Sequence, residues 1–209
     1  GDNSKICLCG MGESAARKAA IKLQKEGATS LISFGVSGAL DSKLRPGDLV
    51  LPRSIYNERL LPVSLAWRDR VQECLPSNLR VIDGKLATSK KVLTSSNEKR
   101  DFARITGASA VDLESGAVAE VAEDSDTPFL AIRAISDPIE FSPPLALLDA
   151  VGPDGKANLS RIISLLLQRS VTLGTLLRLG RDVRTARATL STVALHAGIE
   201  LGTQSTITH

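Results

Sequence analysis

Short apolar runs alternate along the chain with stretches in which apolar residues recur every three or four positions. The short runs predict buried strands, and the wider spacing predicts helices with one buried face. The predicted strands are residues 5–9, 31–36, 49–51, 79–86, a short run that ends before Glu114, and a long run that begins at Phe129. The predicted helices are residues 14–25, 98–105, 145–151, 158–167 and 182–197, and Gly27 and Gly107 are placed to end the first two.

Strands alternate with helices over the first part of the chain, which is typical of an α/β domain. Residues 5–36 have the order strand, glycine turn, helix and strand, and such a unit forms a right-handed crossover. The 209 residues are enough for one domain with a full core. We therefore expect a single domain over residues 1–200 and a flexible tail over residues 201–209.

Two carboxylates stand where predicted strands end. The run from Phe129 stops at Ser136, Asp137 and Pro138, because proline cannot continue a central strand. Glu114 lies at the junction between a short strand and the helix that follows it. Since open α/β sheets bind their ligands at the ends of strands, Asp137 and Glu114 together predict a catalytic cleft.

Composition and charge narrow the possible partners. The net charge of +3 is too small to indicate nucleic acid, and the Arg-rich residues 178–187 predict a solvated or subunit-contacting helix face. No apolar run approaches the roughly 18 residues that cross a membrane. Cys7 and Cys9 share one face of the first predicted strand and are expected to be buried core thiols. The chain has two histidines, and we expect no metal site.

Four motifs occur in an order that resembles a known family. They are GVSGAL at 35–40, PGDLV at 46–50, VDLESGA at 111–117 and RAISD at 133–137. From about Cys9 to Asp137, the chain resembles the purine nucleoside phosphorylase and methylthioadenosine/S-adenosylhomocysteine nucleosidase superfamily. Residues 176–190 further resemble the hopanoid-associated phosphorylase branch, whose members are thought to remove adenine from adenosylhopane. The resemblance implies a three-layer fold with a mixed, twisted central sheet and helices on both faces.

The resemblance also implies cleavage of the N-glycosidic bond of a 5′-substituted adenosine, with adenosylhopane as the expected substrate. Asp137 is expected to protonate N7 of the purine, because the base leaves badly as an anion. Ser136 would orient Asp137. Glu114 would accept hydrogen bonds from the ribose 2′- and 3′-hydroxyls, and Leu113 would pack on the sugar. Asp112 is expected to support the junction between strand and helix instead of touching the ligand.

The remaining expected contacts come from loops. Gly35, Val36, Ser37 and Gly38 would bring backbone close to the ribose and the attacking group, and Ser89 and Val92 belong to the region that covers adenine in relatives. Gly12 opens a helix, so it either binds an anion with the help of Arg17 or only forms a tight turn. Arg133 either assists that anion or forms an ion pair. No cofactor is expected, and phosphate is a possible co-substrate.

The resemblance further predicts a strand carrying a glycine and a glutamate before the first residue given. Without it, residues 1–209 are expected to be less stable and nearly inactive. We expect a cytoplasmic homo-oligomer, a dimer at minimum, with residues 145–151 and 165–167 lining a subunit contact or a channel for a lipid-like substrate. Two alternatives remain open: a methylthioadenosine/S-adenosylhomocysteine nucleosidase, and a nucleoside-binding protein without catalysis.

Overall fold

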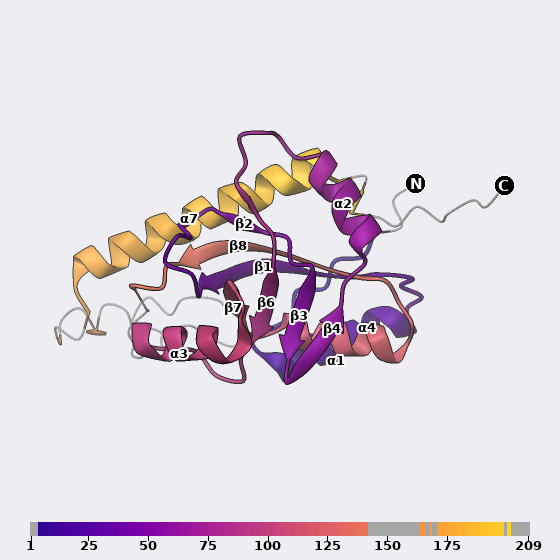
Figure 1. Ribbon diagram of the computed structural model, residues 1–209, viewed down its shortest axis with the longest axis horizontal. Coiled ribbons are helices and arrows are strands. Elements are labelled where there is room, and N and C mark those ends of the chain that lie inside the picture. Colours follow the sequence, from indigo (N-terminus) through magenta and orange to yellow (C-terminus); the bar gives the residue numbers. More distant parts are fainter. Residues whose placement is uncertain (1–3, 142–163, 166–167, 169–170, 199, 202–209) are drawn as a thin grey trace.

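The computed structural model describes residues 4–141, 164–165, 168, 171–198 and 200–201. These residues form a mixed sheet of eight strands with helices on both faces (Figure 1). Across the sheet, the strands are β4 (Arg59–Pro62), β3 (Ser54–Asn57), β6 (Lys85–Thr88), β7 (Ala110–Asp112), β1 (Leu31–Ala39), β8 (Phe129–Asp137), β2 (Leu49–Val50) and β5 (Val81–Ile82).

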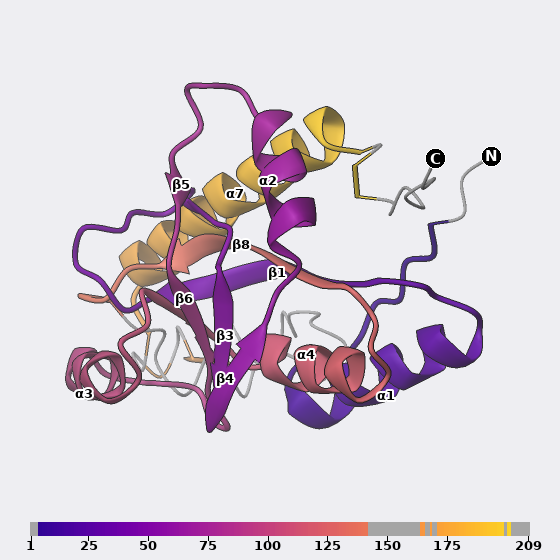
Figure 2. The same ribbon diagram turned by 45° about the vertical axis from the view of Figure 1, so that its right-hand side comes forward.

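Two helical layers enclose the sheet, as Figure 2 shows from the side. On one face, α1 (Glu13–Lys25) and α4 (Ser115–Asp124) bury Ala20, Ala119 and Val121 against the sheet. On the other face, α7 (Leu173–His196) and α2 (Leu65–Glu73) bury a second apolar cluster that includes Trp67 and Val193. The expected three-layer arrangement is therefore confirmed. A fifth helix, α3 (Ser96–Thr106), packs on a smaller cluster around Leu40 and Val111.

The two longest strands form the centre of the sheet. Strand β8 is parallel to β1, and the register runs from Leu31 opposite Phe129 to Ser37 opposite Ile135. Except for its last residue, every residue of β8 is buried, because the strand is covered on both faces. Strand β1 also pairs with β7 in the antiparallel direction, where Gly38 lies opposite Val111. The ends of β1, β7 and β8 thus meet at one place.

Most of the predicted elements occur near their predicted bounds, and four findings were not predicted. The expected strand over 79–86 is two strands, β5 and β6, separated by a turn in which Gly84 has a φ of 122°. The β3–β4 hairpin and α2 were not predicted at all. Helix α7 begins at Leu173, well before the expected residue 182, and the Thr172 side chain caps it by accepting a hydrogen bond from the Thr175 amide.

The expected first strand, residues 5–9, is absent from the structure. These residues have no strand assignment, and the side chains of Ile6 and Leu8 are 89% and 95% exposed. The reason is that β1 already pairs with β7 and β8, so residues 5–9 find no partner strand among the described residues. The predicted crossover unit is therefore wrong in its first part. The prediction of buried thiols is wrong for the same reason, since Cys7 is half-buried and Cys9 is exposed.

Some predictions fall where the structure gives no description. The expected helix over 145–151, most of the one over 158–167, and the tail beyond Leu201 lie outside the described residues. Of the residues proposed to line a subunit contact or a channel for a lipid-like substrate, only Leu165 is described, and it is half-buried. Among the described helices, none is long and apolar enough to span a bilayer.

Candidate active site

A β-bulge in β8 lies immediately before the predicted acid. Strand β1 advances one residue from Ser37 to Gly38 while β8 advances two, from Ile135 to Asp137, so Ser136 is the extra residue. A bulge of this kind re-aims the side chain that follows it. Because of the bulge, the Asp137 carboxyl group lies over Gly38 at the end of the central strand pair.

The absence of a side chain at Gly38 makes room for Asp137. A Cβ atom added to Gly38 would lie 3.1 Å from Oδ1 and 3.3 Å from Oδ2 of Asp137. The Nζ atom of Lys99 lies 2.5 Å from Oδ2. The Asp137 side chain keeps 19% of its surface exposed, so it remains within reach of a ligand.

The serines beside the acid are buried. The Ser136 hydroxyl donates a 3.4 Å hydrogen bond to the Ser37 carbonyl, which joins the bulge to β1. The Ser37 hydroxyl is itself buried and has no hydrogen-bond partner among the described residues. A buried hydroxyl without a partner is costly, so Ser37 is a candidate for contact with a ligand.

The second carboxylate cluster forms where β7 leads into α4. Asp112 accepts hydrogen bonds from the Ser115 amide and from the Thr88 hydroxyl, at 3.2 and 2.8 Å. The Thr88 hydroxyl in turn accepts a 2.7 Å hydrogen bond from the Gly116 amide. These contacts satisfy amides at the start of α4, which have no partner within the helix. The prediction that Asp112 supports this junction is confirmed.

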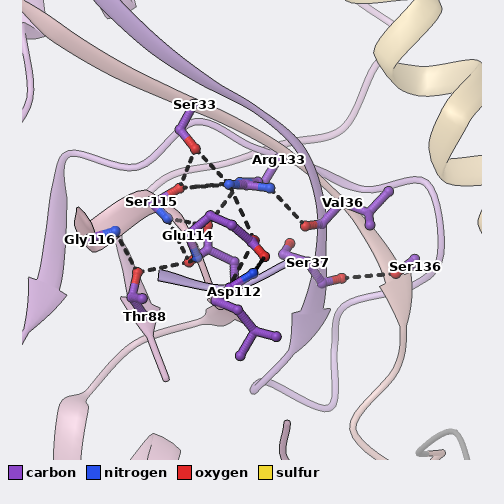
Figure 3. Close-up of polar contacts among 12 residues, drawn as sticks. Ser33, Val36, Ser37, Thr88, Asp112, Glu114, Ser115, Gly116, Arg133 and Ser136 are labelled. Atoms are coloured by element: carbon purple, nitrogen blue, oxygen red, sulfur yellow. Dashed lines mark hydrogen bonds and ion pairs between the residues drawn. The ribbon is translucent and has the colours of Figure 1, made fainter. Parts of the chain in front are cut away.

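Arg133 is the centre of this second cluster, as Figure 3 shows. Its Nε atom lies 2.9 Å from Oδ2 of Asp112, and its Nη2 atom lies 3.8 Å from Oε2 of Glu114. The guanidinium group also donates to the Ser33 and Ser115 hydroxyls and to the Val36 carbonyl. Arg133 and Asp112 are both almost fully buried. Of the two roles considered for Arg133, the structure shows the ion pair.

Gly35 makes this arrangement possible. A Cβ atom at Gly35 would lie 2.5 Å from Nη1 of Arg133, which is too close for any side chain. In this structure, the group that closely approaches the Gly35 backbone is therefore the guanidinium of Arg133.

Glu114 is positioned by the backbone on both sides of it. Its Oε1 atom accepts a 2.9 Å hydrogen bond from the Gly12 amide, and its Oε2 atom accepts one from the Leu113 amide at 3.3 Å. Its side chain is 18% exposed. Each carboxylate oxygen has two acceptor sites, so Glu114 keeps capacity for a diol.

The residues considered for an anion site already have carboxylate partners. The Gly12 amide points at Glu114, and the Arg17 guanidinium pairs with Glu120 and with Glu13. The hydrogen bond to Glu120 is also the main cause that raises the pKa of Arg17. A phosphate at this place would have to compete with these carboxylates.

The loop after β6 lies beside the Glu114 cluster. The Ser89 amide donates to the Asp112 carbonyl at 2.8 Å, and the Ser89 hydroxyl donates to the Lys91 carbonyl at 2.7 Å. Val92 follows in this loop and is half-buried, as is Leu113. Cys9 also lies near Glu114, and desolvation of the thiol by neighbouring groups, together with that negative charge, raises its pKa from the ordinary value of a cysteine. A raised pKa disfavours the thiolate, so Cys9 is a poor candidate for a nucleophile.

The predicted residues thus form two neighbouring clusters that share the end of β1. One contains Glu114 and Arg133, which contacts the Val36 carbonyl. The other contains Asp137 over Gly38. Chemically, the pair offers a carboxyl group at a strand end and a second carboxylate that accepts hydrogen bonds. Sequence reasoning missed Lys99, since a single lysine in an amphipathic helix gives no signal of its tertiary partner.

Comparisons with known proteins agree with this fold. The family model described as the Phosphorylase superfamily matches residues 4–168. The 5′-methylthioadenosine/S-adenosylhomocysteine nucleosidase of Buchnera aphidicola is 27% identical over 138 residues, which cover 56% of this chain and 55% of that protein. The enzyme of the same name from Mycobacterium bovis is 25% identical over 174 residues, which cover 63% and 68%. The chain therefore spans about half the length of the first of these curated relatives.

Two solved structures share the fold. The nucleosidase of the same name from Neisseria meningitidis, in complex with methylthio-immucillin-A, is 18% identical with a TM-score of 0.66, covering 90% of this chain and 78% of that chain. The one from Colwellia psychrerythraea, in complex with adenine, is 17% identical with a TM-score of 0.68, covering 94% and 78%. The family model covers well over half of the chain and includes both carboxylate clusters, so the chain belongs to the Phosphorylase superfamily.

Proposed function

We propose that this protein cleaves the N-glycosidic bond of a 5′-substituted adenosine of the methylthioadenosine or S-adenosylhomocysteine type and releases adenine. The curated relatives carry the name of that nucleosidase activity, which supports this choice of substrate class. The two carboxylate clusters supply the groups that such a reaction requires.

The observation that carries the proposal is the position of Asp137. The bulge at Ser136 places the Asp137 carboxyl group over Gly38, where Lys99 donates to Oδ2 and no described residue donates a hydrogen bond to Oδ1. A purine leaves more readily when N7 is protonated as the bond to the sugar breaks. General acid catalysis of this kind contributes roughly 10²–10⁴-fold to the rate. Asp137 is the proposed acid.

Glu114 is proposed to bind the ribose. Its carboxylate is fixed by two backbone amides and lies near Arg133, so its orientation is set before the substrate arrives. A carboxylate accepts hydrogen bonds from the 2′- and 3′-hydroxyls, and its negative charge favours the oxocarbenium-like transition state. Ser37, whose hydroxyl has no hydrogen-bond partner in the described part of the chain, is proposed to contact the ligand at the end of β1.

Water is the proposed acceptor of the ribosyl group. The Gly12 amide and Arg17 are engaged by carboxylates, and Val36 offers no hydroxyl for a phosphate. Phosphorolysis predicts that adenine release depends on added phosphate, whereas hydrolysis does not. Measuring adenine release with and without phosphate separates the two.

The test of the proposal is Asp137→Asn in the full-length protein. We expect kcat for adenine release from methylthioadenosine to fall roughly 10²–10⁴-fold, because the amide cannot deliver a proton. Asp124→Asn, at the exposed end of α4, is the control and should keep the parent rate. Activity of the Asp137 variant within about threefold of the parent would remove Asp137 from the mechanism.

A second candidate substrate is adenosylhopane, with a large apolar 5′-substituent. At the start of α7, Leu173 and Leu177 are more than half exposed, and an open surface hollow of about 420 Å³ is lined by Gly174, Leu177, Arg178 and Arg181. The Arg178 guanidinium lies 4.4 Å from the centre of the Phe141 ring, four residues after the proposed acid. The two exposed leucines are the observation that favours considering a lipid-like 5′-substituent. Adenine release from adenosylhopane in preference to methylthioadenosine would favour adenosylhopane as the substrate. Adenine release from neither nucleoside would leave nucleoside binding without catalysis as the remaining function.

A further inference from the structure

Lys99 is the most deeply buried cation beside the proposed acid. It lies in the first half of α3, and its side chain is only 1% exposed. Lysine is almost never fully buried unless it is paired. The structure holds it there by capping α3: the Ser95 hydroxyl accepts a hydrogen bond from the Glu98 amide, and the Glu98 carboxylate accepts one from the Thr94 amide.

All three described partners of the Lys99 ammonium group are acceptors. Nζ donates to Oδ2 of Asp137 at 2.5 Å and to the carbonyl oxygens of Pro138 and Phe141, both at 3.0 Å. An ammonium group has three donors and no acceptor, so these contacts match the charged form of lysine completely. One buried cation therefore joins α3 to the acid and to the backbone that follows it.

The contact makes the two oxygens of Asp137 different. Oδ2 faces a group that can only donate, so a proton on Oδ2 would point at another donor. The oxygen closer to Gly38 is Oδ1, which has no partner among the described residues. When Asp137 is protonated for the reaction, the proton is therefore expected on Oδ1.

We infer that Lys99 is a positioning residue for the acid: it fixes Oδ2 of Asp137 and thereby directs the proton on Oδ1 to N7 of the base. This inference rests on the proposed function. In the reaction, the Oδ1 proton moves to N7, the C1′–N9 bond breaks, and its electron pair stays on the base, which leaves as neutral adenine. Water then adds to C1′, and the proton that it loses restores the acid.

Lys99 also acts on the charge that develops. As the proton leaves Oδ1, Asp137 becomes a carboxylate beside a buried ammonium that is already oriented. A preorganised donor aimed at developing charge is a large contribution to catalysis, and removing one costs about 10²–10³-fold in kcat. The effect should appear only when the leaving group needs the proton.

The experiment compares two leaving groups in the full-length protein. One substrate is 5′-methylthioadenosine, and the other is the 4-nitrophenyl glycoside of 5-methylthioribose, whose leaving group departs without protonation. We expect Lys99→Met to lower kcat for the nucleoside by about 10², with KM within about threefold, and to leave kcat for the nitrophenyl glycoside near the parent value. Arg100→Met, at an exposed position of the same helix, is the control.

Equal losses of kcat on both substrates would show that Lys99 has a structural role, and this would overturn the inference. An unchanged kcat on the nucleoside would also overturn it. In an Asp137→Asn background, Lys99→Met should cost nothing further, and a full additional loss would also overturn it. If Lys99→Met does not fold, Lys99→Gln is judged by the same ratio of the two rates. A parent protein that releases no adenine from any 5′-substituted adenosine would refute the proposed function instead.

Discussion

Removal of the buried guanidinium at Arg133 gives the sharpest test of how the site is held together. Arg133→Met keeps a long apolar side chain but leaves the Asp112 carboxylate without its cation. Both side chains are at most 6% exposed, so solvent cannot replace the lost partner. Breaking a buried ion pair by removing one member costs about 3–5 kcal/mol. Asp112 keeps its Thr88 and Ser115 donors, which places the expected loss toward the lower end of that range.

Urea denaturation followed by circular dichroism measures this loss directly. With an m-value of about 2–3 kcal/mol per M, a loss of 3–5 kcal/mol lowers the midpoint by roughly 1–2.5 M. The double variant Arg133→Met with Asp112→Asn should be more stable than Arg133→Met alone, because it removes the unpaired charge. Arg59→Met, which breaks an exposed pair with Glu123, is the control and should change the midpoint little. A shift for Arg133→Met as small as that of the control would show that the cluster does not stabilise the fold.

Two further changes test the proposed ribose-binding role of Glu114 and the start of α3. Glu114→Gln should weaken binding of the nucleoside more than binding of free adenine, because only the nucleoside has the diol; equal losses in calorimetric titrations with both ligands would contradict that role. Hydrogen bonds from Lys91 and from Thr94 lower the pKa of Glu98 from 4.5 to about 2. The stabilisation that the Glu98 carboxylate provides is therefore complete above about pH 5, and it is lost as the pH falls from about 4.5 toward 2. The difference in melting temperature between the parent and Glu98→Gln should therefore shrink over that pH range. A difference that stays constant down to pH 2 would show that the Glu98 carboxylate does not cause it. Glu73→Gln, on α2, is the control.

The helices and strands that were predicted most accurately are those whose start or end is marked by residues within or next to the element. Strand β8 is a continuous apolar run that ends at proline, and α3 ends where Gly107 adopts a φ of 63°, a conformation that glycine favours. The β3–β4 hairpin was missed because its turn has no glycine, and Glu58 adopts a φ of 59° instead. In α2, only Trp67 and Val71 are buried apolar residues, which is too few to show a helical period.

The sequence indicated which residues belong to the candidate site, but it did not indicate which contacts those residues make. Asp137 and Glu114 were found because each lies where an apolar run stops. The bulge at Ser136 has no glycine or proline to mark it, and its existence follows from pairing with β1. Lys99 lies 38 residues from Asp137 in sequence, so only the packing of α3 against the sheet brings them together. The failed prediction for residues 5–9 has the same cause, since a strand needs a partner that its own sequence does not specify.

The network around Asp112 also determines how the site moves. Its hydrogen bonds and ion pairs connect β6, β7, α4, β8 and β1, so none of these elements can separate without breaking buried polar contacts in the others. Fluctuations that open one of them alone are therefore suppressed, and the amide protons of Ser115 and Gly116 should exchange with solvent only when the whole domain unfolds. By contrast, residues 5–9 have no such contacts among strands and should exchange quickly. The residues at the base of the proposed site would then be rigid on the timescale of catalysis, and any adjustment to different 5′-substituents of the proposed substrate would come from the segments around them.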